Sequence, residues 1–148
     1  MSYQEKRSIV YIFNILLITG IYWWYAFHFQ SEEVIYSTEE FSVWGKIILF
    51  MIPAQIVITI ITQIIFSIVN TVATREEIPT ITDERDKLID LKSIRNAYTV
   101  FMIGVVLSMI PVVMDKPLYV MFNLLIGCLL LAQFVWSASQ FYFYRRGY

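Results

Sequence analysis

The sequence predicts an all-α, polytopic membrane protein with four transmembrane helices. Composition is the first observation: 58% of the 148 residues are hydrophobic and only 16% are charged, whereas soluble domains average about 45–50% and 25%. Distribution is the second, because the charged residues cluster between long apolar stretches. The third is the length of those stretches, since a membrane-spanning helix needs about 20 mainly apolar residues. A single transmembrane domain, residues 1–148, accounts for this pattern.

Each of the four apolar stretches is bounded by polar residues. The first is longer than the ~7–15 residues of a signal-peptide core, so we expect an anchor that is retained. The second contains Pro53, which predicts a kink. The third is the shortest, and its Gly104 and Ser108 form a small-xxx-small step that permits close helix approach. The predicted spans are about 8–29, 43–73, 97–114 and 118–143, and three spans with a re-entrant segment are the structural alternative.

The distribution of Lys and Arg predicts the orientation of the spans. Loops that carry more basic residues near span ends stay in the cytoplasm. Of the 11 Lys and Arg residues, nine fall on one side and two, Lys46 and Lys116, on the other. We therefore expect a multi-pass protein of the cell (plasma) membrane with cytoplasmic N- and C-termini. The nine basic residues are Lys6, Arg7, Arg75, Arg85, Lys87, Lys92, Arg95, Arg145 and Arg146.

The second predicted helix carries a row of uncharged polar side chains. Most recur at every fourth residue, which places them along one helix face. Two interpretations are open: hydrogen bonds to other helices, or the wall of a polar path. The row contains no ionisable group, and ion paths usually recruit such groups, so the structural interpretation is favoured. The row, called the polar stripe, consists of Gln55, Thr59, Gln63, Ser67, Asn70 and Thr71.

A charged segment before the third span predicts a helix that begins in the cytoplasm. Thr82 suits the N-cap, and acidic residues in a first turn complement the helix dipole. No strong helix breaker follows before Pro111, so we expect one unbroken helix as far as residue 110. Helices 2 and 3 would extend into the cytoplasm, where residues 74–96 form the loop and helix extension, with residues 83–96 projecting ~21 Å as a stalk. The predicted partner-binding residues are Asp83, Glu84, Arg85, Asp86, Lys87, Asp90, Lys92 and Arg95.

The start of this segment carries a family resemblance. The string DERDKLI at 83–89, followed by Lys92, Ala97 and Tyr98, resembles the DERD signature of small prokaryotic four-helix membrane proteins grouped as DUF2178. The close match covers about 16 residues, and the rest of the chain agrees only in hydropathy. The family has no assigned activity. Relatives of this type are considered alongside helix-turn-helix regulators, so the resemblance implies a cytoplasmic protein partner.

The residue types that most catalytic and metal sites require are sparse. The single histidine, His28, lies beside interfacial aromatic residues, and the single cysteine, Cys128, lies in an apolar stretch. A metal site needs several such ligands. The sequence contains no Ser/His/acid set, nucleotide-binding loop or cysteine pair, so we expect no catalytic residue, no cofactor and no metal. The net charge of −1 gives no reason to expect direct nucleic-acid binding.

The leading functional hypothesis is a non-enzymatic membrane sensor or partner-binding scaffold that acts through its charged cytoplasmic helix extension. The alternative is an oligomeric channel or small-solute carrier that uses the polar stripe, and an intramembrane enzyme ranks third. The expected partners are the lipid bilayer, a second copy in a homo-oligomer with a dimer favoured, and a cytoplasmic regulatory protein.

Overall fold

The computed structural model describes residues 3–28, 40–74 and 84–147. Within them lie five helices: α1 (Tyr3–His28), α3 (Glu40–Thr74), α4 (Glu84–Ser108), α5 (Ile110–Val113) and α6 (Leu118–Arg146). Four stretches are long and apolar enough to cross a membrane, namely Tyr3–Tyr25, Ser42–Ala73, Glu84–Val113 and Leu118–Arg146. The prediction of an all-helical chain with four such stretches is confirmed.

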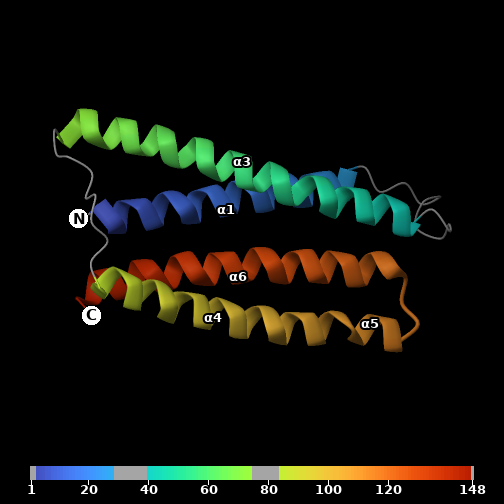
Figure 1. The fold of residues 1–148 in the computed structure, drawn as a ribbon. Helices are drawn as coiled ribbons and strands as arrows, with labels where there is room; N and C mark the ends of the chain where they lie inside the picture. Colours follow the sequence, from blue (N-terminus) through green and yellow to red (C-terminus); the bar gives the residue numbers. More distant parts are fainter. Residues whose placement is uncertain (1–2, 29–39, 75–83, 148) are drawn as a thin grey trace.

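The long helices form a bundle of two antiparallel pairs (Figure 1). One pair is α1 with α3, and the other is α4 with α6. Helix α6 packs against α4, α1 and α3, and its interface with α4 is the most extensive in the bundle. Figure 1 also shows that the start of α1, the start of α4 and the end of α6 lie at the same end. The topology therefore brings residues from three separate parts of the chain together there.

Small residues allow α4 and α6 to approach closely. A Cβ atom placed on Gly104 would lie 2.5 Å from both Cβ and Sγ of Cys128. Ser93 and Ser108 on α4 and Ser137 on α6 are fully buried. Short side chains at such positions let two helix backbones come near each other. The close approach predicted from Gly104 and Ser108 is confirmed at Gly104.

Helix α4 ends earlier than the sequence suggested. It stops at Ser108, and the separate short helix α5 begins at Ile110. Pro111 lies in the first turn of α5. A proline has no N–H to donate to the carbonyl four residues back, and its ring crowds that turn. The chain tightens accordingly, with the Met109 amide donating to the Val106 carbonyl at 3.2 Å.

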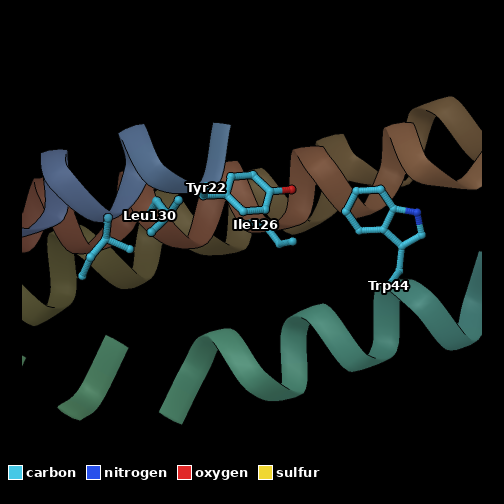
Figure 2. Packing of buried hydrophobic residues seen from close by; sticks show 5 residues of the cluster. Tyr22, Trp44, Ile126 and Leu130 are labelled. Atoms are coloured by element: carbon cyan, nitrogen blue, oxygen red, sulfur yellow. The ribbon is translucent and has the colours of Figure 1, made fainter. Parts of the chain in front are cut away.

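A cluster of buried side chains joins α1, α3 and α6 near the other end of the bundle (Figure 2). Trp44 of α3 stacks on Phe122 with ring centroids 5.9 Å apart. The Tyr22 hydroxyl of α1 donates to Oδ1 of Asn123 at 2.7 Å. Ile126 and Leu130 of α6 complete the contact. Aromatic side chains at this end therefore hold α1, α3 and α6 together.

Most of α3 is exposed apart from this cluster. Pro53 lies inside the helix without ending it. Leu49 and Phe50 expose 76% and 80% of their surface, and many isoleucines along the helix are more than half exposed. A soluble protein rarely presents so large an apolar surface to water, whereas lipid chains would cover it.

Candidate functional site

A polar cavity lies where the start of α1, the start of α4 and the end of α6 meet. It has a volume of ≈ 270 Å³. We call it the polar end pocket. Its lining residues are Gln4, Arg7, Ser8, Tyr11, Asp86, Lys87, Asp90, Trp136, Gln140 and Tyr144.

Two aspartates of α4 face into the polar end pocket. They are four residues apart, which places them on one face of the helix. The Asp90 Oδ1 atom accepts hydrogen bonds from Gln140 Nε2 at 2.8 Å and from Trp136 Nε1 at 3.2 Å. The Asp86 Oδ2 atom accepts from Gln4 Nε2 at 3.2 Å. Neutral donors from α1 and α6 therefore fix the orientation of both carboxylates.

Arg7 and Lys87 supply positive charge to the same pocket. The Arg7 guanidinium donates to the Tyr11 hydroxyl at 3.4 Å and lies 5.6 Å from the centre of that ring. Tyr11 in turn meets Trp136 edge to face, with ring centroids 5.5 Å apart. Two acidic and two basic side chains line the pocket, so their formal charges cancel.

The predicted partner-binding residues divide between two sides of α4. Asp86 and Asp90 face the polar end pocket. Lys92 lies 5.8 Å from the centre of the Phe143 ring of α6. The exposed members are Glu84, Arg85, Lys87 and Arg95, with Lys87 at the pocket rim. Asp83 and the predicted cap Thr82 lie outside the described residues.

The first turns of α4 are part of the bundle. Besides the aspartate contacts, Asn96 Nδ2 donates to Ser139 Oγ of α6 at 3.3 Å. The segment that the sequence suggested as a projecting stalk thus lies beside the end of α6 and the start of α1 (Figure 1). Its outer face, which carries Leu88 and Leu91, stays exposed.

The polar stripe of α3 faces other helices. Gln55 is buried, and its Nε2 donates to Oε1 of Gln133 on α6. Thr59 accepts a hydrogen bond from Asn14 of α1 at 3.1 Å. These contacts agree with the structural interpretation of the stripe, because each joins two helices within the apolar part of the bundle.

The half of the stripe nearer the end of α3 contacts the start of α1. The Ser67 and Tyr3 hydroxyls lie 3.3 Å apart, and Lys6 Nζ donates to Asn70 Oδ1 at 3.4 Å. Thr71 instead donates to the carbonyl of Ser67 on its own helix at 3.0 Å.

Gln63 is the exception within the stripe. Its Nε2 is buried, and within the described part of the chain no group accepts its hydrogen bonds. A side cavity of ≈ 360 Å³ between α1 and α3 is lined by Gln63 together with Thr59, Ser67 and residues of α1. The stripe therefore combines helix-joining contacts with one buried amide nitrogen that has no acceptor among the described residues.

The sequence reasoning missed the α6 half of the polar end pocket. Trp136, Gln140 and Tyr144 follow one another at intervals of four residues, and this spacing marks a common helix face. The sequence therefore shows that these three residues share a helix face, but it does not show which residues of α1 and α4 lie opposite that face. Among the described residues, no group of three or more His, Cys, Asp or Glu side chains is suited to hold a metal ion. His28 ends α1, and the described structure leaves its side chain out.

Comparisons with protein-family models, with curated proteins and with solved structures found no match. The resemblance to the DERD family therefore stays a prediction.

Proposed function

We propose that the chain is a non-enzymatic integral membrane protein of the cell membrane that binds a cytoplasmic protein and acts as a sensor or scaffold. The supporting observation is the outer face of the first turns of α4. Leu88 and Leu91 expose 58% and 64% of their surface there, and Arg85 and Arg95 are exposed on the same segment. Apolar side chains three residues apart with basic neighbours suit an acidic amphipathic helix.

The arrangement of basic residues supports the orientation in this proposal. In Figure 1, the start of α1, the end of α6 and the start of α4 lie at one end of the bundle. The basic residues of these three segments therefore gather at that end. Such a concentration marks the cytoplasmic side of a membrane protein, and it would place the outer face of α4 where a cytoplasmic partner can reach it.

Photocrosslinking in cells tests the proposal directly. A photoreactive residue at Leu91 should crosslink one discrete protein, and Arg95→Glu in the same chain should abolish that product. The matched control is Val106, which lies on the same helix and exposes 66% of its surface in the apolar stretch. A photoreactive residue there should crosslink lipid. The same product from both positions would show that lipid covers the whole outer face, which would contradict the proposal.

A second candidate function is an oligomeric channel or small-solute carrier, in which a homodimer is the smallest assembly. The specific observation in its favour is Gln63, whose side chain helps to line the side cavity between α1 and α3 and whose buried amide nitrogen has no acceptor among the described residues. Flux measurements in liposomes discriminate the two functions. Solute flux that Gln63→Leu abolishes without loss of folding would support the channel, and absence of flux with intact partner capture would support the scaffold.

A further inference from the structure

We propose that the polar end pocket binds the headgroup of a phospholipid that carries both a primary ammonium and a phosphate, with one acyl chain along the groove between α4 and α6. This inference rests on the membrane insertion proposed above but not on the protein partner. The pocket faces the interior of the bundle, whereas the partner would bind the outer face of α4.

An apolar groove lies beside the polar end pocket and shares the lining residue Trp136 with it. This groove has a volume of ≈ 260 Å³, and most of its lining is apolar: Ile94, Ala97, Phe101, Leu129, Ala132 and Trp136. Trp136 belongs to both cavities. Its indole N–H points to Asp90 in the pocket, while its side chain also forms part of the groove wall. A polar site and an apolar site therefore meet at one residue.

Helix geometry places the two cavities in line. On α4, Asp90, Ile94 and Ala97 are separated by four and three residues, so they lie on one face. On α6, Gln140, Trp136 and Ala132 are separated by four residues each. Both helices thus turn the same face to pocket and groove. An amphiphilic ligand fits this arrangement, because its polar and apolar parts are also arranged in line.

The depth of the cavities in a bilayer agrees with this ligand. The stretch Glu84–Val113 has 30 residues and is about 45 Å long at 1.5 Å per residue. The hydrocarbon core of a bilayer is only ~30 Å thick. If Asp115 and Lys116 stay at the opposite surface, the first ten or so residues of α4 lie at headgroup depth. Asp86 and Asp90 are among them, whereas Ala97 and Phe101 lie within the hydrocarbon.

The charges of the pocket select a zwitterionic headgroup. Asp86 and Asp90 can accept hydrogen bonds from an ammonium, while Arg7 and Lys87 can hold a phosphate. A purely anionic headgroup would leave the two carboxylates facing negative charge. A primary ammonium suits the carboxylates better than a quaternary one, because it has three N–H donors. A quaternary ammonium has no N–H to donate and is held instead over aromatic faces, and the Arg7 guanidinium already lies over the Tyr11 ring, 5.6 Å from its centre.

The test measures lipid retention by the full chain. Protein stripped of lipid is offered equal amounts of phosphatidylethanolamine, phosphatidylcholine and phosphatidylglycerol with identical acyl chains, and bound lipid is counted by native mass spectrometry. We expect phosphatidylethanolamine to be retained about tenfold over the other two, which is the scale of one charge-assisted hydrogen bond. Equal retention of all three lipids would overturn the proposal.

Variants assign the effect to the pocket. Asp90→Asn should remove the preference for phosphatidylethanolamine, while Asp115→Asn, the same change in the turn before α6, should keep it. Because Asp90 also orients Trp136 and Gln140, Lys87→Gln at the exposed rim provides a variant with less effect on folding. It should lower retention of all three lipids severalfold, and Lys116→Gln should not. A Lys87→Gln protein that retains lipid like the wild type would contradict phosphate binding at this site.

Two further arms identify the source of the headgroup. Soluble phosphoethanolamine at the same concentration should not displace the lipid, because it lacks the acyl chain that occupies the groove. Complete displacement would mean that a soluble zwitterion is the ligand and would overturn the lipid assignment.

Ala97→Leu should fill part of the groove, lowering lipid retention severalfold without changing the preference among headgroups. Loss of crosslinking at Leu91 with the lipid preference intact would refute the partner and leave this inference standing.

Discussion

The close approach of α4 and α6 at Gly104 makes a definite prediction about stability. In an uncrowded helix, replacing glycine by alanine gains about 1 kcal/mol of helix propensity. In Gly104→Ala, however, the new methyl group would lie 2.5 Å from Cβ and Sγ of Cys128. Carbon atoms pack best at about 3.5–4.0 Å, so the helices must separate by about 1 Å. Overpacking of this kind costs about 1–3 kcal/mol, and we expect net destabilisation.

The structure also specifies which second change should restore stability. Cys128→Gly removes Cβ and Sγ, the two atoms that the new methyl group would meet. The Cα of residue 128 remains, but it is 3.7 Å away, which is an ordinary contact distance. The double variant Gly104→Ala/Cys128→Gly should therefore be about 1–3 kcal/mol more stable than the sum of the single changes predicts. Cys128→Ala keeps Cβ and should rescue poorly. Gly127→Ala is the matched control, since no atom lies within 4 Å of its added methyl group.

The assay is the free energy of unfolding in mixed micelles, followed by circular dichroism as a denaturing detergent is titrated in. Gly104→Ala should lower it, and Gly127→Ala should leave it unchanged or raise it. The reasoning is refuted if Gly104→Ala is as stable as the wild type, or if Cys128→Ala rescues it as well as Cys128→Gly does.

Other predictions concern the hydrogen bonds between helices and the orientation of the chain. Gln55→Leu should lower the free energy of unfolding by about 1 kcal/mol, because it leaves the hydrogen-bonding partner Gln133 on α6 unsatisfied. Gln63→Leu should be neutral or stabilising, because it removes a buried amide nitrogen that lacks an acceptor among the described residues. Tyr22→Phe should cost about 1 kcal/mol in the same titration through the lost hydrogen bond to Asn123, and an unchanged value would count against that contact. For orientation, a cysteine at Asp115 in a Cys128→Ala background should react with an impermeant maleimide added to intact cells, and one at Arg146 should not; the reverse pattern would invert the proposed topology.

The helices could be predicted from the sequence because each long apolar stretch is a local feature. Of the polar stripe on α3, Gln55 and Thr59 hydrogen-bond to side chains of α6 and α1. The early end of α4 was missed, since the effect of Pro111 on the preceding turn was underestimated.

The polar end pocket could not be predicted from the sequence alone. Periodicity places Asp86 and Asp90 on one face of α4 and Trp136 and Gln140 on one face of α6. Whether those faces meet depends on the register of the two helices. That register is set by how α4 packs against α6, including the close contact between Gly104 and Cys128. The contribution of Gln4 depends on a contact across 82 positions of sequence.

The pairing of α4 with α6 also has a consequence for folding kinetics. These helices are joined by residues 109–117 alone, which include α5, so bringing them together costs little loop-closure entropy. The contacts of α3 span much longer separations, such as the 78 positions between Gln55 and Gln133. Contacts of α1 with α6 span even more, such as the 101 positions between Tyr22 and Asn123. We therefore expect the α4–α6 hairpin to form first and α1 and α3 to dock later, so changes on α3 should mainly accelerate unfolding. Since α3 contributes no residue to the polar end pocket, transient undocking of α3 would leave that pocket assembled.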